Sequence, residues 1–137
     1  MSLVLDTSLT LSWYFEDERT AQANALLDRV VDEGAVVPGL WRLEVASGFQ
    51  TAIRRKRATA EYRDRALEAL AEMDITVDRD TDAHAWNTTL HLSDRFALTL
   101  YDAAYLELAQ RTKLPLASLD QRLCEAATTL GLQVLGR

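Results

Sequence analysis

The sequence predicts an α/β fold, namely a three-layer α/β/α sandwich around a short, mostly parallel sheet. Two observations indicate this class. Short apolar runs, such as residues 3–5 and 35–37, show no polar alternation, which is typical of strands that helices cover on both faces. These runs alternate with longer segments in which apolar residues recur at helical spacing. That order is characteristic of strand–helix–strand units in a parallel sheet.

The individual elements follow from local patterns. We expect Ser8 to cap the first helix, Gly34 to end the second, Thr99 to begin the helix that stops before Pro115, and Gly131 to end the last. Apolar runs predict strands at residues 3–5, 35–37, 75–77, 116–118 and 132–135. Helical spacing predicts helices at residues 9–15, 17–33, 40–56, 59–73, 80–94, 100–114 and 121–130.

The same spacing predicts which faces of the helices are buried. Val31 falls on the apolar face of the second helix and Leu43 on that of the third. The helix at residues 80–94 holds Trp86 and Leu90 one turn apart. Cys124 falls on the apolar side of the last helix, so we expect it to be buried.

Length and composition limit the class of protein. The length of 137 residues suits one domain, over residues 1–137. No apolar run approaches the ~20 residues of a membrane span, and no signal peptide precedes the first apolar run. With a single cysteine as well, these features lead us to expect a cytoplasmic protein without membrane attachment. The formal net charge of -6 argues against a general nucleic-acid coat protein, but not against an enzyme that holds nucleic acid through a metal ion.

Four acidic residues occupy positions that the fold would bring together. Asp6 and Asp120 follow strands, whereas Glu44 and Asp102 lie in early turns of helices on the same sheet edge. Taken singly, Asp6 and Asp120 suit helix N-caps, and Asp102 suits the positive end of a helix. Glu44 lies beside an apolar stripe and needs a partner if buried.

Taken together, the four carboxylates would repel one another unless a cation lay among them. A site of oxygen ligands alone favours Mg²⁺, with Mn²⁺ as a substitute. We therefore expect Asp6, Glu44, Asp102 and Asp120 to be metal ligands and catalytic residues. Ser8 and Ser118, each two residues from an acid, are expected to support them by holding the carboxylates or a metal-bound water.

Other conspicuous residues favour a structural interpretation. His84 and His91 are two helical turns apart, whereas a zinc pair is usually one turn apart. The basic run at residues 54–57 suits a solvated helix end better than an RNA contact. Trp13, Tyr14 and Phe15 cannot all face the core of one short helix, so we expect at least one of them to reach a partner surface.

The motifs LVLDTS, SWYFEDE, LEVASG, LYDAAYLELA and LASLDQRL, in this order, resemble those of the PIN-domain family, in particular the VapC-type toxins of bacterial toxin–antitoxin pairs. The resemblance implies a Mg²⁺-dependent endoribonuclease whose acidic site falls on Asp6, Glu44, Asp102 and Asp120. It also implies a homodimer that an antitoxin protein silences. Where some members have a further acid, this chain has Arg122, so the resemblance leaves open whether one or two metal ions bind.

Two alternatives belong to other classes. A non-cleaving PIN-like module that binds RNA or protein would not need all four acids. A phosphorelay receiver domain also places acids at strand ends, but it would have adjacent acids after the first strand and a lysine after the last. Thr7 and Ser8 follow Asp6 instead, and no lysine follows the final strand, so the sequence disfavours a receiver domain.

Overall fold

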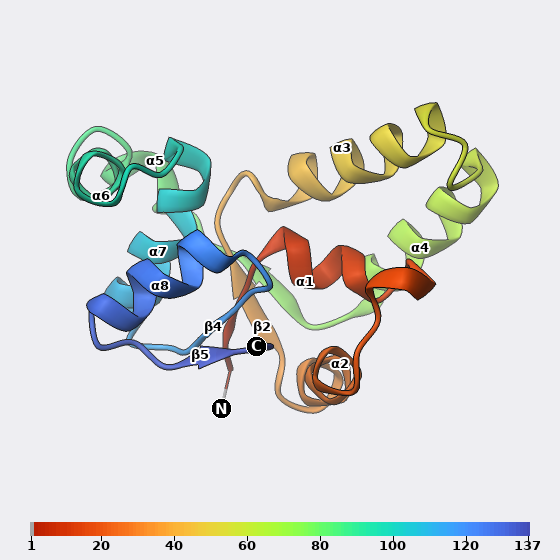
Figure 1. Cartoon of the computed structure of the whole chain (residues 1–137), viewed down its shortest axis with the longest axis horizontal. Helices are drawn as coiled ribbons and strands as arrows, with labels where there is room; N and C mark the ends of the chain where they lie inside the picture. Colours follow the sequence, from red (N-terminus) through yellow and green to blue (C-terminus); the bar gives the residue numbers. More distant parts are fainter. Residues whose placement is uncertain (1) are drawn as a thin grey trace.

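The computed structural model describes residues 2–137 and confirms the α/β class. Its parallel sheet has the strand order β3-β2-β1-β4-β5, and helices cover both faces. Figure 1 shows α1 to α4 on one side of the strands and α5 to α8 on the other. The strands are β1 (Val4–Leu5), β2 (Ala35–Val37), β3 (Ile75–Val77), β4 (Leu116–Ala117) and β5 (Val134–Leu135). The helices are α1 (Thr7–Ser12), the 3₁₀ helix η1 (Glu16–Glu18), α2 (Ala21–Glu33), α3 (Trp41–Arg54), α4 (Ala60–Glu72), α5 (Thr81–His84), α6 (Thr88–Phe96), α7 (Leu100–Thr112) and α8 (Gln121–Thr129).

The sheet reverses its direction of growth between β1 and β4. From β1 the chain adds β2 and β3 on one side, then returns to add β4 and β5 on the other. Val4 of β1 pairs with Val36 of β2 and with Leu116 of β4, so β1 is central and buried. In open parallel sheets, ligands bind at such a reversal, outside the carboxyl ends of the strands. A functional site is therefore expected beside the segments that follow β1 and β4.

Side-chain caps fix the start of several helices. Thr20, Thr59 and Thr99 each accept a hydrogen bond from a backbone N–H in the first turn of α2, α4 and α7, respectively. Gly34 ends α2 at φ +79°, and an added Cβ there would lie 2.9 Å from the backbone oxygen of Asp74. The predicted positions of the strands and of most helices are thus confirmed to within a few residues.

Three predicted helices differ from those in the structure. The first begins at Thr7 rather than Leu9 and ends before Trp13, so Ser8 lies inside it and does not cap it. The helix predicted at residues 17–33 is divided, because the chain is extended at Arg19 and Thr20 between η1 and α2. The segment at residues 80–94 is not one helix, because the chain leaves the helical path between α5 and α6 and only resumes it at Thr88. Trp86 lies at this break with 88 % of its surface exposed. Its helical spacing from Leu90 therefore did not indicate a buried face.

The buried faces of α2 and α3 also differ from the prediction. Val31 and Leu43 are 62 % and 77 % exposed, and Trp41, Val45 and Phe49 form the buried face of α3 instead. Trp13 and Phe15 are buried, so Tyr14 is the partly exposed member of the aromatic run. Trp13 donates its indole N–H to the carbonyl of Ala23, and Phe15 packs against Phe49. Because the chain turns after Ser12, these two side chains no longer need to share one helix face.

α7 is the central helix of its layer. It packs against β1, β4, α6 and α8, and residues 103–109 are all buried. Cys124 of α8 is also buried, as predicted. No helix within residues 2–137 is long and apolar enough to cross a membrane.

An ionic network holds the C-terminal half of α7. Glu107 is 3 % exposed, and both of its carboxylate oxygens accept hydrogen bonds from Arg111, at 2.7 and 3.1 Å. Arg111 also donates to both oxygens of Asp78, which follows β3. The hydrogen bonds and charges of Glu107 and Asp78 raise the pKa of Arg111, so the guanidinium keeps its charge.

We expect Arg111→Met to lower the free energy of unfolding by about 3 kcal/mol, because it leaves the Glu107 carboxylate buried without its cation. Urea denaturation at pH 7 measures this. Arg63→Met removes an ion pair to the exposed Asp64 and is the control, with an expected loss of under ~1 kcal/mol. Equal losses in the two variants would show that the Arg111 network behaves as an ordinary surface pair.

Candidate active site

Asp6 lies at the carboxyl end of β1, at the reversal of the sheet, and only 5 % of it is exposed. Its backbone N–H bonds to the carbonyl of Ala117 on β4. Ser8 and Ser118 both donate their hydroxyls to Oδ2 of Asp6, at 2.6 and 2.7 Å. Ser8 thus comes from the chain after β1 and Ser118 from the chain after β4. Asp6 occupies the N-cap position of α1, but its side chain caps no backbone N–H.

The pKa of Asp6 is raised from 3.8 to about 6. Burial is the largest cause, because it penalises the charged form. The two serine hydroxyls oppose this increase, whereas the charges of Asp102 and Glu44 add to it. The helix-cap interpretation of Asp6 therefore fails, and the side chain is a buried acid close to two others.

Glu44 is half-buried in the first turn of α3, and its Oε1 atom accepts two hydroxyl hydrogen bonds. Tyr105 of α7 donates at 2.6 Å and Thr7 of α1 at 3.1 Å. The hydroxyls of Tyr105 and Thr7 are also 2.8 Å apart. Glu44 was predicted to need a partner if buried, and these two hydroxyls are its partners.

Asp102 and Asp120 lie at the beginnings of two neighbouring helices. Asp102 is half-buried in the first turn of α7, and its pKa is raised by burial and by the charges of Asp120 and Glu44. Thr99 and the charge of Arg122 partly oppose this increase. Asp120 accepts a hydrogen bond from the backbone N–H of Leu123 and caps α8, so its helix-cap interpretation is correct. Asp120 nevertheless contributes its charge to the same group.

The four acids are electrostatically coupled but do not form a closed ligand set as they stand. Within residues 2–137, no three His, Cys, Asp or Glu side chains are arranged to hold a metal ion. The chemistry of the group nonetheless fits a hard divalent cation, because every candidate donor is a carboxylate oxygen. Ser8 and Ser118 both bond to Oδ2 of Asp6, and Tyr105 and Thr7 both bond to Oε1 of Glu44. In each of these two acids, a pair of hydroxyls thus fixes one carboxylate oxygen.

Neither Thr7 nor Tyr105 was predicted from the sequence to be a site residue. A usable signal existed for Tyr105, because it follows Asp102 by three residues and so lies on the same face of α7. Its hydroxyl is buried on that face, where a polar group needs a partner. For Thr7 the sequence offers only its place next to Asp6.

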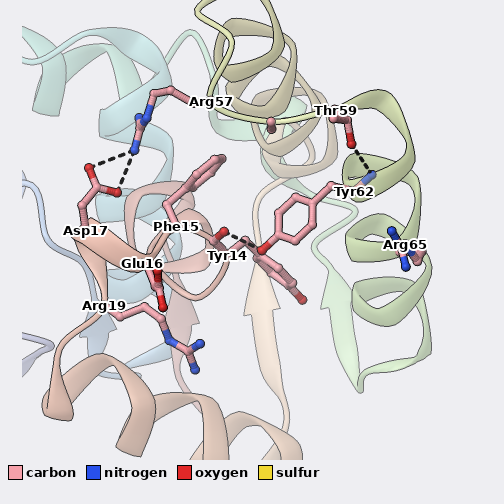
Figure 2. A pocket seen from close by; sticks show the side chains of 10 residues that line it. Tyr14, Phe15, Glu16, Asp17, Arg19, Arg57, Thr59, Tyr62 and Arg65 are labelled. Carbon is pink, nitrogen blue, oxygen red and sulfur yellow. Dashed lines mark hydrogen bonds and ion pairs between the residues drawn. The ribbon is translucent and has the colours of Figure 1, made fainter.

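The remaining candidates lie away from the acids. His84 is half-buried and His91 exposed, on separate helices. In the basic run, Arg57 donates to both carboxylate oxygens of Asp17 and lies over the ring of Phe15. Figure 2 shows this contact at the rim of a pocket that Tyr14 and Tyr62 also line, between the first helices and α4. Arg57 therefore fastens the end of α3 to η1, which supports the structural interpretation of the run.

Comparison with known proteins identifies a family and several similar proteins. The family model described as "PIN domain" matches residues 3–128. The chain is 28 % identical to Ribonuclease VapC3 of Pyrobaculum aerophilum over 125 residues, which is 91 % of this chain and 94 % of that protein. The crystal structure of PAE2754 from Pyrobaculum aerophilum is similar with a TM-score of 0.70 and 20 % identity, over 98 % of this chain and 83 % of that one. The crystal structure of FitAcB from Neisseria gonorrhoeae is similar with a TM-score of 0.63 and 18 % identity, over 99 % of this chain and 97 % of that one.

We expect Asp6→Asn to stabilise the protein in EDTA at pH 7. Because the pKa of Asp6 is raised to about 6, the folded state still holds a proton on Asp6 between about pH 4 and pH 6, where the unfolded chain has released it. The free energy of unfolding therefore falls as pH rises from about 4 to about 6, and by pH 7 the cost amounts to roughly 1–3 kcal/mol. Asparagine removes this cost and still accepts the serine hydrogen bonds.

Urea denaturation of both proteins between pH 4 and pH 7.5 measures the difference. The two stability curves should separate progressively above pH 4, with Asp6→Asn higher. A variant that is less stable than wild type at pH 7 would contradict the burial argument at this position.

Proposed function

Because the chain belongs to the PIN-domain family, we propose that it is a Mg²⁺-dependent endoribonuclease and the toxin of a toxin–antitoxin pair. The observation that carries the proposal is the buried Asp6 at the reversal of the sheet, with the charges of Asp102 and Glu44 acting on it. Similarity to Ribonuclease VapC3 supports RNA as the substrate. The relative's activity and the all-carboxylate donor set agree on one chemistry, the hydrolysis of a phosphodiester bond.

Asp6, Glu44, Asp102 and Asp120 are the residues that would hold the cation, with Mn²⁺ able to replace Mg²⁺. When bound, a divalent cation polarises a phosphodiester and favours deprotonation of an attacking water. The chain's own contribution is to bring the carboxylates together and to orient them. Ser8 and Ser118 favour the charged form of Asp6 by donating to it, and they fix its direction.

Two other hypotheses are less well supported than this proposal. The hypothesis of a receiver domain is wrong, because the chain belongs to another family and its strand order differs from the 2-1-3-4-5 order of flavodoxin-like sheets. A PIN-like module that binds RNA or protein without cutting remains the competing hypothesis. The presence of all four acids at coupled positions disfavours it, and a cleavage assay separates the two.

The proposed partners are an antitoxin and a second copy of this chain. The likeness to a VapC ribonuclease supports the antitoxin, which would be a small separate protein that covers the acidic site. The homodimer rests on a different surface from the aromatic run that the sequence suggested. Leu43, Trp86 and Leu100 are exposed and line one apolar hollow beside the beginnings of α3 and α7. Monomers seldom expose such a patch, and a two-fold axis would place it against itself.

We expect the purified protein to cleave RNA with Mg²⁺ or Mn²⁺ and not in EDTA. Asp102→Asn should reduce the cleavage rate by at least ~100-fold, because it removes a charged oxygen ligand. Gel analysis of an end-labelled single-stranded RNA measures the rate. Asp94→Asn, an exposed acid on α6, is the matched control and should cleave at the wild-type rate. Cleavage in EDTA, or by Asp102→Asn at the control rate, would refute the metal-dependent mechanism.

A homodimer through the apolar hollow predicts that Leu43→Glu and Trp86→Glu each produce a monomer, since both bury a charge at the contact. Sedimentation velocity at micromolar concentration measures the mass. Val31→Glu, which changes an exposed apolar residue of α2 outside this hollow, should remain dimeric. A wild-type monomer, or a dimer that all three variants retain, would count against this surface.

A further inference from the structure

Glu44 is held by a hydrogen-bonded triangle that joins three helices. Its corners are Oε1 of Glu44 on α3, the Tyr105 hydroxyl on α7 and the Thr7 hydroxyl on α1, separated by 2.6, 2.8 and 3.1 Å. Tyr105 is fully buried, and Thr7 and Glu44 are half-buried. We propose that Tyr105, assisted by Thr7, is the positioning residue that fixes the direction of the Glu44 carboxylate toward the other acids. This inference rests on the proposed function.

The available protons determine which contact matters most. The triangle contains two hydroxyl protons for three short contacts, because a carboxylate donates none. The shortest contact, from Tyr105 to Glu44, is that of a hydroxyl donating to a carboxylate, which is the stronger kind of hydrogen bond. The Thr7 proton is then shared between the Tyr105 oxygen and Glu44. Tyr105 is therefore the principal donor, and Thr7 orients both groups.

The attachment points make this triangle suited to positioning. Tyr105 lies one turn after Asp102 on the same face of α7, and Thr7 is next to Asp6 in the chain. Each hydroxyl is thus fixed to a backbone segment that also carries another of the acids. Glu44 sits on α3, which belongs to the opposite layer from α7 (Figure 1). Without the triangle, the direction of Glu44 would depend on its own rotatable bonds alone.

A long acidic side chain loses conformational entropy when a ligand fixes it. In this chain two hydroxyls already fix one oxygen of Glu44, so cation binding would not have to order the side chain. Loss of the partner that orients a metal ligand typically lowers metal affinity by ~10- to 100-fold. A merely structural hydroxyl, by contrast, would change stability without changing metal affinity.

The test compares Mn²⁺ affinity, by isothermal titration calorimetry, with melting temperature in EDTA. Tyr105→Phe should remain folded and lose ~10- to 100-fold in Mn²⁺ affinity. Thr7→Val should lose less, and Thr7→Ser, which keeps the hydroxyl, should bind as wild type does. Tyr62→Phe is the matched control, because it removes a hydroxyl that donates to the Tyr14 carbonyl at 2.6 Å, remote from the acids. It should change the melting temperature and leave Mn²⁺ affinity unaltered.

The outcomes separate the two proposals. If Asp102→Asn loses Mn²⁺ binding while a folded Tyr105→Phe binds as wild type does, the positioning role is overturned and the metal site stands. An equal loss of affinity in Tyr62→Phe also overturns the positioning role. If the wild-type protein does not bind Mn²⁺, the proposed function fails, and the inference fails with it. If Tyr105→Phe does not fold, the comparison of Thr7→Val with Thr7→Ser decides, and equal affinities overturn the inference.

Discussion

The burial of the Asp6 carboxylate at the reversal of the sheet is the constraint on which the rest of the site depends. A buried acid needs hydrogen-bond donors, and here they come from the two segments that diverge at the reversal. Ser8 follows β1 and Ser118 follows β4, so their bonds to one oxygen of Asp6 join the two halves of the sheet. The pairing of Leu5 with Ala117 sets the register that makes this possible. A parallel sheet with another strand order would separate the two serines.

The fold offsets only part of the repulsion between the four carboxylates. Asp102 lies in the first turn of α7 and Asp120 caps α8, so both are near positive helix ends. Each such contact stabilises by about 0.3–1 kcal/mol. The rise in the pKa of Asp6 to about 6 corresponds to roughly 3 kcal/mol, which is larger than either contribution. The site therefore holds charge at a net cost to stability, and the buried core around β1, β4 and α7 must supply the difference.

The sequence sufficed for the architecture, because each strand is a short apolar run and most helices have a clear cap or stop. It failed where spacing alone was used to assign a buried face. Leu43 is exposed because Trp41, Val45 and Phe49 form the buried face of α3 instead. Trp86 is exposed because it lies at the break between α5 and α6, which the periodicity does not mark. Trp13 and Phe15 are buried because the chain turns after Ser12, a turn that requires no glycine or proline signal.

For the candidate site, the order of acids along the chain was enough to select residues, because strand ends of a parallel sheet share one edge. Their partners were less accessible. Ser8 and Ser118 could be selected from their distance of two residues to an acid. The contact between Tyr105 and Glu44 spans 61 positions and depends on how α3 and α7 face each other across the sheet. Local spacing carries no information on such a contact, which only the tertiary arrangement supplies.

α7 combines two demands that usually fall on different parts of a protein. Residues 103–109 are buried throughout, Asp102 stands at one end of the helix, and Arg111 is locked to Glu107 and Asp78 near the other. Rotation of α7 about its axis would displace Asp102 and would at the same time break the ionic network of Arg111. In the divergence of related sequences, α7 should therefore accept few substitutions and exchange them in compensating pairs. The exposed faces of α2 and α4 carry neither demand and should accept more substitutions.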